Sequence, residues 1–263
     1  MLDLEESRSA AEGSVNDLRQ MWSNRPTLGL WHRLATQQAA ELVGAAGYDW
    51  VCIDAQHGYL DEAHVRVMLA GLNRAGCPSV VRAPWHDPGF AMRALDAGAA
   101  AILFPTIEDP EQAERAVRAC RYPPDGYRSW AGLGLGREAP EVANKTICCG
   151  VMIETAGALK NIDAILDVQG LDFAFIGPDD LAISLGCEPT TEPSNPVVLE
   201  AIERIRTSCE KRNLPAGIYC GSPTMVRQWG NAGFRILTVT SDTAILSQGA
   251  LAALSTAREH LSA

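Results

Sequence analysis

Eight short apolar runs, separated by longer segments of helical period, are the feature that most constrains the fold of this chain. The runs are continuously apolar rather than alternating, which is typical of strands buried on both faces of a parallel sheet. Amphipathic stretches such as 109–120 and 196–211 lie between them. Eight strand–helix units in 263 residues predict one α/β domain, a (β/α)8 TIM barrel, rather than two domains. The runs lie at 27–31, 50–55, 79–85, 100–107, 146–154, 172–178, 215–221 and 234–241.

The limits of the domain follow from the segments outside these runs. No low-complexity linker divides the chain, so we expect one barrel domain over 15–263 and a loose acidic tail over 1–14. Residues 125–145 form the longest irregular segment, and a loop of that length is more often functional than incidental. The terminal stretch 243–261 is apolar enough to predict a helix that packs against a second copy in a homo-oligomer.

Charge and cysteine usage exclude several classes of partner. The formal net charge of −10, with no basic cluster, argues against nucleic-acid binding. The amino terminus lacks the basic-then-apolar pattern of a signal peptide, and no apolar run approaches the ~20 residues needed to span a bilayer. The eight cysteines form no CxxC pair, and several lie in apolar runs. We therefore expect a cytoplasmic protein without nucleic-acid or membrane partners.

Polar residues collect at the carboxyl ends of several predicted strands, where the chemistry of a TIM barrel takes place. One acidic residue after one strand would indicate only a surface turn. Carboxylates after two neighbouring strands, with a histidine and an arginine after two others, predict an active site. The residues are Asp54, Gln56 and His57 after the second strand, Arg82 on the third, Glu154 at the end of the fifth, and Asp179 and Asp180 after the sixth.

Glu154 and Asp180 predict a divalent-metal site. Two carboxylates supply hard oxygen ligands and leave most of the coordination sphere open, which suits Mg²⁺ or Mn²⁺, with Co²⁺ or another divalent ion as an alternative. Considered alone, Glu154 could simply be a charged residue at the end of a strand, followed by Thr155 as the N-cap of a helix. Considered alone, Asp180 could be an acidic residue in the first turn of a helix, where the helix dipole favours a negative charge. Together they favour the metal.

His57 and Arg82 are the candidate acid/base and cationic groups. His57 lies three residues after Asp54, and a carboxylate can orient a histidine and make it a usable base; a structural histidine is the alternative. Arg82 follows two valines, and a buried guanidinium needs an anion, either a protein carboxylate or a substrate oxygen. A helix that begins at Asp179 would offer free N–H groups to the carboxylate of a 2-oxo acid.

The motifs that carry these residues resemble the HpcH/HpaI aldolases, which are class II, metal-dependent pyruvate aldolases such as 4-hydroxy-2-oxoheptanedioate and 2-keto-3-deoxy-sugar-acid aldolases. The matching elements are DWVCIDAQHG, SVVRAPW, ALDAG, RYPPDGYR and VMIETAGALKNIDAILDVQGLDFAFIGPDDLA. The resemblance covers nearly the whole chain and implies a barrel of the phosphoenolpyruvate/pyruvate superfamily, usually assembled as a hexamer. It implies Glu154 and Asp180 as metal ligands, His57 as acid/base, Arg82 as the group that stabilises the enolate oxygen, and Asp96, with Asp54 sharing the task, as the carboxylate that raises the basicity of His57.

The resemblance also implies how the substrate is held, through Arg82, Met152 and the backbone of Asp179 and Asp180. Met152 stands where relatives often have a glutamine, and Asp179 where they often have a small residue. Gln56 replaces a glutamate of some members. If Met152, Trp31 and Tyr219 line the mouth, they favour an acceptor less polar than a sugar aldehyde.

The implied reaction is reversible cleavage of a 4-hydroxy-2-oxo acid to pyruvate and an aldehyde through a pyruvate enolate held on the metal. Lys145 and Lys160 fall outside strand ends, which argues against a Schiff-base mechanism. A related enolate lyase, such as an oxaloacetate decarboxylase or an acyl-CoA lyase, would use the same residues. A non-catalytic 2-oxo acid binding protein is the alternative from a different class, although a binding protein needs no base.

Overall fold

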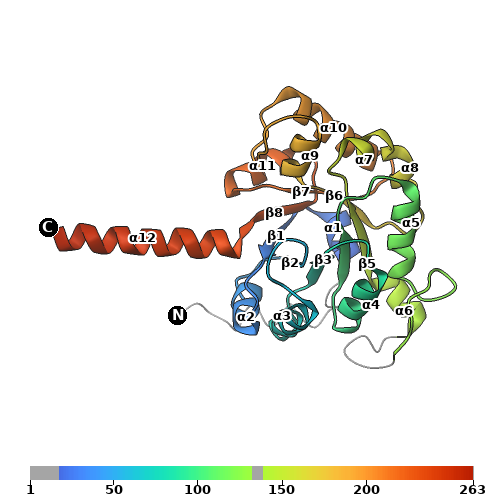
Figure 1. Ribbon diagram of the computed structural model, residues 1–263, viewed down its shortest axis with the longest axis horizontal. Coiled ribbons are helices and arrows are strands. Elements are labelled where there is room, and N and C mark those ends of the chain that lie inside the picture. The colour runs from blue at the N-terminus through green and yellow to red at the C-terminus, as the bar shows by residue number, and fades with distance from the viewer. Residues whose placement is uncertain (1–17, 132–138, 263) are drawn as a thin grey trace.

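The eight predicted strands are confirmed as one closed parallel barrel whose strand order follows the sequence (Figure 1). The computed structural model describes residues 18–131 and 139–262. Each strand pairs with the next, and β8 closes on β1; the pairing of β2 with β3 places Asp54 beside Arg82. The strands are β1 Thr27–His32, β2 Trp50–Asp54, β3 Ser79–Arg82, β4 Ala101–Phe104, β5 Cys148–Met152, β6 Phe173–Ile176, β7 Ala216–Tyr219 and β8 Ile236–Ser241.

Helices connect the strands and cover the outside of the barrel, and most begin at the capping signals of the sequence. Thr36, Asp109 and Thr155 accept hydrogen bonds from the backbone at the starts of their helices. The helices are α1 Leu18–Asn24, α2 Gln37–Gly44, α3 Glu62–Arg74, α4 Pro88–Asp96, α5 Pro110–Ala119, α6 Pro140–Thr146, α7 Ala156–Lys160, α8 Ile162–Leu166, α9 Pro178–Ser184, α10 Pro196–Glu210, α11 Pro223–Ala232 and α12 Asp242–Ser262.

Large aromatic side chains fill the barrel interior where the strands carry glycine. A Cβ at Gly29 would lie 2.3 Å from the Trp50 ring, and one at Gly150 would lie 2.2 Å from Phe173. Trp22 of α1 packs on Phe173 with ring centroids 4.6 Å apart and closes the amino end of the barrel. The amino half is therefore a packed core, and a substrate has room only at the carboxyl ends of the strands.

The last part of the segment 125–145, which the sequence analysis predicted as irregular, forms helix α6. Pro140 occupies the first turn of this helix, where a missing N–H has no cost, and Glu141 follows it. Helix α6 directly precedes β5 and so lies toward the amino ends of the strands. Residues 132–138 and the predicted tail 1–14 lie outside the described residues. Among the helices that the structure describes, none is long and apolar enough to cross a membrane.

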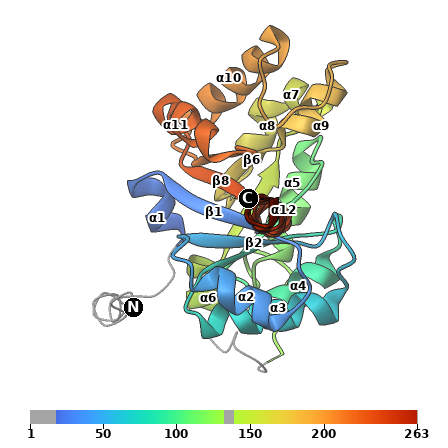
Figure 2. The same ribbon diagram turned by 90° about the vertical axis from the view of Figure 1, so that its left-hand side faces the viewer.

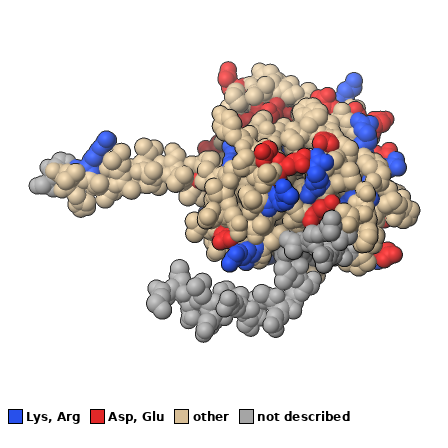
Figure 3. Space-filling view, turned by 60° about the horizontal axis from the view of Figure 1, so that its bottom comes forward, with Lys and Arg blue, Asp and Glu red and all other residues tan. Residues whose placement is uncertain are grey.

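The terminal helix α12 projects away from the barrel rather than packing against its own β8 (Figures 1 and 2). Its leucines are largely exposed, with Leu246 at 60% and Leu251 at 65%. On the face drawn in Figure 3 the projecting helix shows almost no charged side chains except near its tip. The first residue, Asp242, is buried and fixes the helix to the end of β1.

Candidate active site

A cavity of about 250 Å³ opens at the carboxyl ends of the strands. It brings together five of the predicted residues, which come from four different segments of the chain. Asp54 and Glu154 lie behind its wall, fully buried. The lining residues are Trp31, Arg33, His57, Arg82, Met152, Phe175, Gly177, Pro178, Asp179, Asp180, Thr191 and Tyr219.

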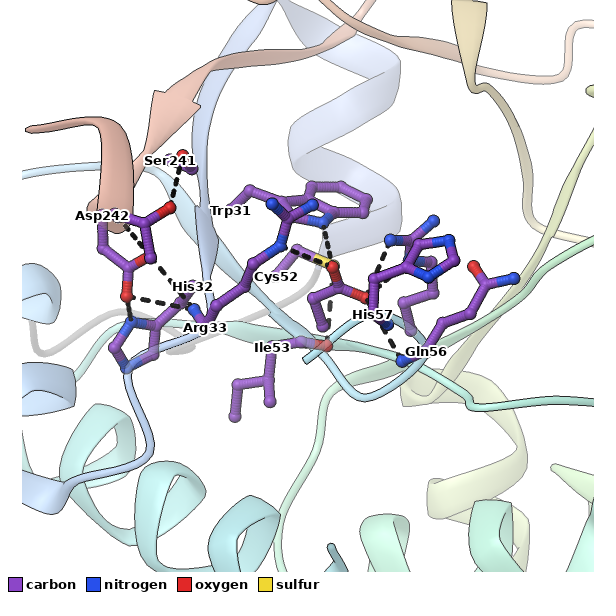
Figure 4. A network of polar contacts seen from close by, with 12 residues as sticks. Trp31, His32, Arg33, Cys52, Ile53, Gln56, His57, Ser241 and Asp242 are labelled. Carbon is purple, nitrogen blue, oxygen red and sulfur yellow. Dashed lines mark hydrogen bonds and ion pairs between the residues drawn. The ribbon is translucent and has the colours of Figure 1, made fainter. Parts of the chain in front are cut away.

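Asp54 is the centre of the hydrogen-bond network behind the cavity, and Figure 4 labels four of the residues that donate to it, Trp31, Arg33, Gln56 and His57. Its side chain is completely buried, and both oxygens accept several hydrogen bonds. Burial opposes ionisation of this carboxyl, but the two arginines outweigh it and hold its pKa below the ordinary value. Its donors are Arg82 Nε at 2.8 Å and the N–H groups of Gln56 and His57 at 3.2 Å on Oδ1, and Trp31 Nε1 at 3.0 Å and Arg33 Nε at 2.8 Å on Oδ2.

Arg82 finds its anion in a protein carboxylate, one of the two partners that the sequence left open. Its Nε and Nη2 both lie 2.8 Å from Asp54 Oδ1. The guanidinium lies 5.0 Å from the centre of the Trp31 ring, and its Nη1 lies 3.8 Å from Met152 Sδ. Burial lowers the pKa of Arg82, but Asp54 and Glu154 raise it, so the net pKa rises and the group stays charged. This fixed cation is held at the wall of the cavity.

His57 lies on the turn after β2, exposed to solvent at the mouth of the cavity. Its backbone N–H binds Asp54 Oδ1, so Asp54 positions the turn rather than the imidazole. Within the part of the chain that the structure describes, no hydrogen bond to the His57 ring is found. The ring is therefore accessible to a substrate hydroxyl or a water molecule.

Glu154 is buried directly after β5, and its two oxygens differ. Oε1 accepts a hydrogen bond of 2.8 Å from the Thr106 N–H, whereas Oε2 is buried and has no protein partner. Burial raises the pKa of Glu154 to about 7; the Thr106 N–H and Arg82 oppose this rise, and Asp180 adds to it. Thr155 caps α7 as expected and leaves the Glu154 carboxylate for the cavity.

Two neighbouring backbone positions support Glu154. Thr106 has a φ of 48°, a conformation that is strained for a β-branched residue, and it directs its N–H to Glu154. Gly177 precedes α9, and a Cβ there would lie 2.5 Å from Glu154 Oε2 and 3.1 Å from Met152 Cε. The space beside Oε2 is thus kept open by the absence of a side chain.

The donor set fits a divalent cation. The unpaired Glu154 Oε2 is a buried carboxylate oxygen, and such an oxygen needs a positive partner. Asp180 is close enough to repel Glu154, so a cation between the two would relieve this repulsion. Among the described residues no group of three His, Cys, Asp or Glu side chains could hold a metal. Two carboxylates with the rest of the coordination sphere open is the pattern expected of Mg²⁺ or Mn²⁺.

Asp96 is not brought to this site within one chain. It is the last residue of α4, which runs back from the carboxyl ends of the strands, and Arg128 donates to it at 2.7 Å. It lines a separate surface cavity with Arg66 and Phe90. The expected effect of Asp96 on His57 therefore rests on the resemblance alone.

Arg33, Thr106 and Thr191 are among the lining or supporting residues that the sequence analysis missed. Arg33 directly follows β1, so the rule that identified Arg82 and Glu154 could have found it at the end of the first strand. Thr106 acts through its backbone and Thr191 lies in the α9–α10 connection. No sequence signal marks either of them.

The comparisons with known proteins agree with this geometry. Residues 27–248 match the model of the HpcH/HpaI aldolase/citrate lyase family. A hydroxypyruvate/pyruvate aldolase of Sagittula stellata is 36% identical over 231 residues, which cover 86% of this chain and 90% of that protein. A 4-hydroxy-2-oxo-heptane-1,7-dioate aldolase of Salmonella typhimurium is 35% identical over 236 residues, which cover 87% of this chain and 89% of that protein.

A solved structure gives the same answer for the fold. The HpcH/HpaI aldolase/citrate lyase family protein from Burkholderia cenocepacia superposes with a TM-score of 0.86 at 36% identity, covering 92% of this chain and 99% of that one. The match of family, sequence and structure extends over both halves of the barrel and over all the strand ends that form the cavity. The chain belongs to the HpcH/HpaI aldolase/citrate lyase family.

Proposed function

We propose that the protein is a class II pyruvate aldolase, a carbon–carbon lyase that reversibly cleaves a 4-hydroxy-2-oxo acid to pyruvate and an aldehyde. The observation that carries this proposal is the buried, unpartnered Glu154 Oε2 beside Asp180, with the charged Arg82 across the same cavity. A site that combines two metal-binding carboxylates with a fixed cation is suited to stabilising an enolate.

Glu154 and Asp180 are the proposed ligands of a divalent cation, Mg²⁺ or Mn²⁺, and both are oxygen donors of the kind these ions prefer. When bound, such an ion would polarise the 2-oxo group as a Lewis acid. The Thr106 N–H holds Glu154 Oε1 and so directs Oε2 to the cation. The first N–H groups of α9, at Asp179 and Asp180, have no partner inside the helix and are the proposed donors to the pyruvate carboxylate.

His57 and Arg82 have the two chemical roles. His57, exposed at the mouth, is proposed to take the proton of the 4-hydroxyl, directly or through water, as the C3–C4 bond breaks. Arg82 is proposed to stabilise the negative charge that develops on the enolate oxygen. Asp54 holds Arg82 and the turn of His57 without facing the substrate. Lys145 lies in α6 and Lys160 in α7, so neither is placed for a Schiff base.

Other enolate lyases remain the alternative on the same residues. An oxaloacetate decarboxylase would share the pyruvate enolate, and an acyl-CoA lyase would need cationic groups for the phosphates of the cofactor. A protein that only binds 2-oxo acids would have no use for His57 at the mouth.

The test is exchange of the pyruvate methyl protons in D₂O, followed by proton NMR. With Mg²⁺ or Mn²⁺ the wild type should exchange the methyl group, and EDTA or Glu154→Ala should abolish this exchange. Absence of exchange with every divalent ion would remove the pyruvate-enolate proposal. An aldehyde screen in the cleavage direction then separates an aldolase from a decarboxylase.

We further propose a homo-oligomer in which α12 packs on a second copy. A barrel helix normally covers its own strand, yet α12 leaves the barrel and exposes Leu246, Leu251 and Leu254. An apolar helix of 21 residues needs a partner surface in water. The resemblance favours a hexamer. A cytoplasmic location is part of the same proposal and fits the eight free cysteines, seven of them buried.

A further inference from the structure

Arg33 is a second arginine in the cavity that the mechanism does not use. It follows β1 and lies among the lining residues together with His57 and Tyr219. Its position is fixed by the backbone, because its N–H donates to Asp242 Oδ2 at 3.0 Å, next to the buried His32–Asp242 pair. In Figure 4 the side chain extends from this pair toward the cluster around His57.

The two arginines of the cavity differ in how much of each guanidinium is engaged. Arg82 is 5% exposed, binds Asp54 Oδ1 through both Nε and Nη2, and lies over Trp31. Arg33 has a side chain that is 34% exposed and gives only Nε to Asp54 Oδ2. Among the described residues its two η nitrogens have no protein acceptor. An arginine that is anchored at Nε and open at both η nitrogens presents a planar fork suited to a carboxylate.

The two arginines share one carboxylate, Asp54, on this wall of the cavity. Asp54 is one negative charge that faces two positive charges, Arg33 and Arg82. Arg82 interacts electrostatically with Glu154, so it belongs to the half of the cavity that holds the pyruvate portion. Arg33 lies on the other oxygen of Asp54, and Arg33, Asp179 and Asp54 all act electrostatically on Tyr219 of β7. The open η nitrogens of Arg33 therefore lie in the half of the cavity beside Tyr219, which we assign to the aldehyde.

We propose that Arg33 binds an anionic group of the acceptor aldehyde, so that the enzyme prefers short aldehyde acids over neutral aldehydes of equal length. This inference rests on the proposed aldolase function. Trp31, Met152 and Tyr219 do line the cavity, as the sequence analysis considered, but the open guanidinium changes the preference that they alone would favour. The cavity of about 250 Å³ is small for a ligand site, which favours a short acceptor.

A purely structural role for Arg33 makes a different prediction. If the side chain only supported Asp54, its loss would disturb Arg82 and the His57 turn, and every acceptor would suffer alike. If Arg33 binds the acceptor, its replacement should lower kcat/KM for charged acceptors only, mainly by raising the KM of the aldehyde. The ratio between two acceptors therefore separates the two roles.

The experiment measures kcat/KM for aldol addition of pyruvate to 4-oxobutanoate and to butanal, which have the same chain length and differ in the terminal carboxylate. The variants are Arg33→Ala and Arg33→Lys, with Arg66→Ala, an exposed arginine of α3 outside the cavity, as the matched control. The wild type should favour 4-oxobutanoate. Arg33→Ala should reduce this preference about 10- to 100-fold, the value of one or two charged hydrogen bonds. Arg33→Lys should retain part of the preference for 4-oxobutanoate, and Arg66→Ala should leave this preference at the wild-type value.

Two results would overturn the inference, and a third would remove the aldolase function on which it rests. An equal loss for both acceptors in Arg33→Ala would assign Arg33 a structural role, and an unchanged preference would show that it takes no part in acceptor binding. Failure of the wild type to exchange the pyruvate methyl protons would instead remove the aldolase function, and the inference with it.

Discussion

Replacement of Glu154 by glutamine tests the metal site through stability rather than activity. Burial raises the pKa of Glu154 to about 7, from an ordinary value of 4.5. A glutamine keeps the acceptor for the Thr106 N–H and removes the charge. Without metal, Glu154→Gln should therefore be more stable than the wild type above pH 7, an unusual result for a replacement inside an active site.

The size and sign follow from proton linkage. Between pH 4.5 and 7 the folded state holds a proton on Glu154 that the unfolded state has released, so the stability from this group is complete below about 4.5 and is lost as the pH rises through about 7. A difference of 2.5 pH units corresponds to about 3 kcal/mol. This is the penalty of an ionised, unpartnered Glu154, and a bound cation would remove it.

The assay is urea unfolding of the metal-free wild type and Glu154→Gln between pH 5 and pH 8.5, at one protein concentration because assembly affects stability. The wild type should lose about 3 kcal/mol relative to the variant over this range. Added Mg²⁺ or Mn²⁺ at pH 8 should stabilise the wild type and leave Glu154→Gln unchanged. Glu141→Gln, an exposed acid of α6, is the control and should follow the wild type. Parallel curves for wild type and Glu154→Gln, or equal stabilisation of both by metal, would refute the reasoning.

Three further substitutions test other parts of the structure. Gly177→Ala places a Cβ 2.5 Å from Glu154 Oε2. Metal affinity, measured by calorimetry, should therefore fall at least 10-fold, and the free energy of unfolding should fall by about 1–3 kcal/mol. Unchanged metal affinity would show that the space beside Oε2 is not needed for the cation. Asp54→Ala leaves the buried Arg82 without its anion and should cost about 3–5 kcal/mol by chemical denaturation; a loss below 1 kcal/mol would count against the network. Removal of residues 245–263, which keeps the buried Asp242, should reduce the assembly to a smaller species by light scattering, and an unchanged mass would place the interface elsewhere.

The fold was predictable because each strand of this barrel is marked by its own apolar run. All eight runs became strands, and the helices 109–120 and 196–211 appear as α5 and α10 within one residue at each end. Six of the eight predicted runs extend past the carboxyl end of the observed strand; the run 100–107, for example, ends as a strand at Phe104. These extra residues begin the loops of the site, where some backbone groups, such as the Thr106 N–H, bind side chains. Helices α1 and α6 were not predicted, and the segment that contains α6 was interpreted as irregular.

Most of the polar residues that line the site could be predicted from the sequence, but the contacts between them could not. The periodicity of a barrel places strand ends on one rim, so His57, Arg82 and Asp180 could be grouped without a structure. Distances across the rim depend on strand register and rotamers, which the sequence does not show. The action of Asp96 on His57 accordingly rests on the resemblance, and within the chain Asp96 accepts a hydrogen bond from Arg128.

Asp54 shows what this limit means for interpreting mutants. Its two oxygens hold different arginines, Arg82 on the side of Glu154 and Arg33 on the side of Tyr219, and it also fixes the backbone of the His57 turn. A substitution at Asp54 would therefore disturb the pyruvate half and the acceptor half together and would resemble the loss of a catalytic base. Arg33 and Arg82 bind different oxygens of that carboxylate, so their single variants would separate the two proposed roles, that of Arg82 at the enolate and that of Arg33 in the choice of aldehyde.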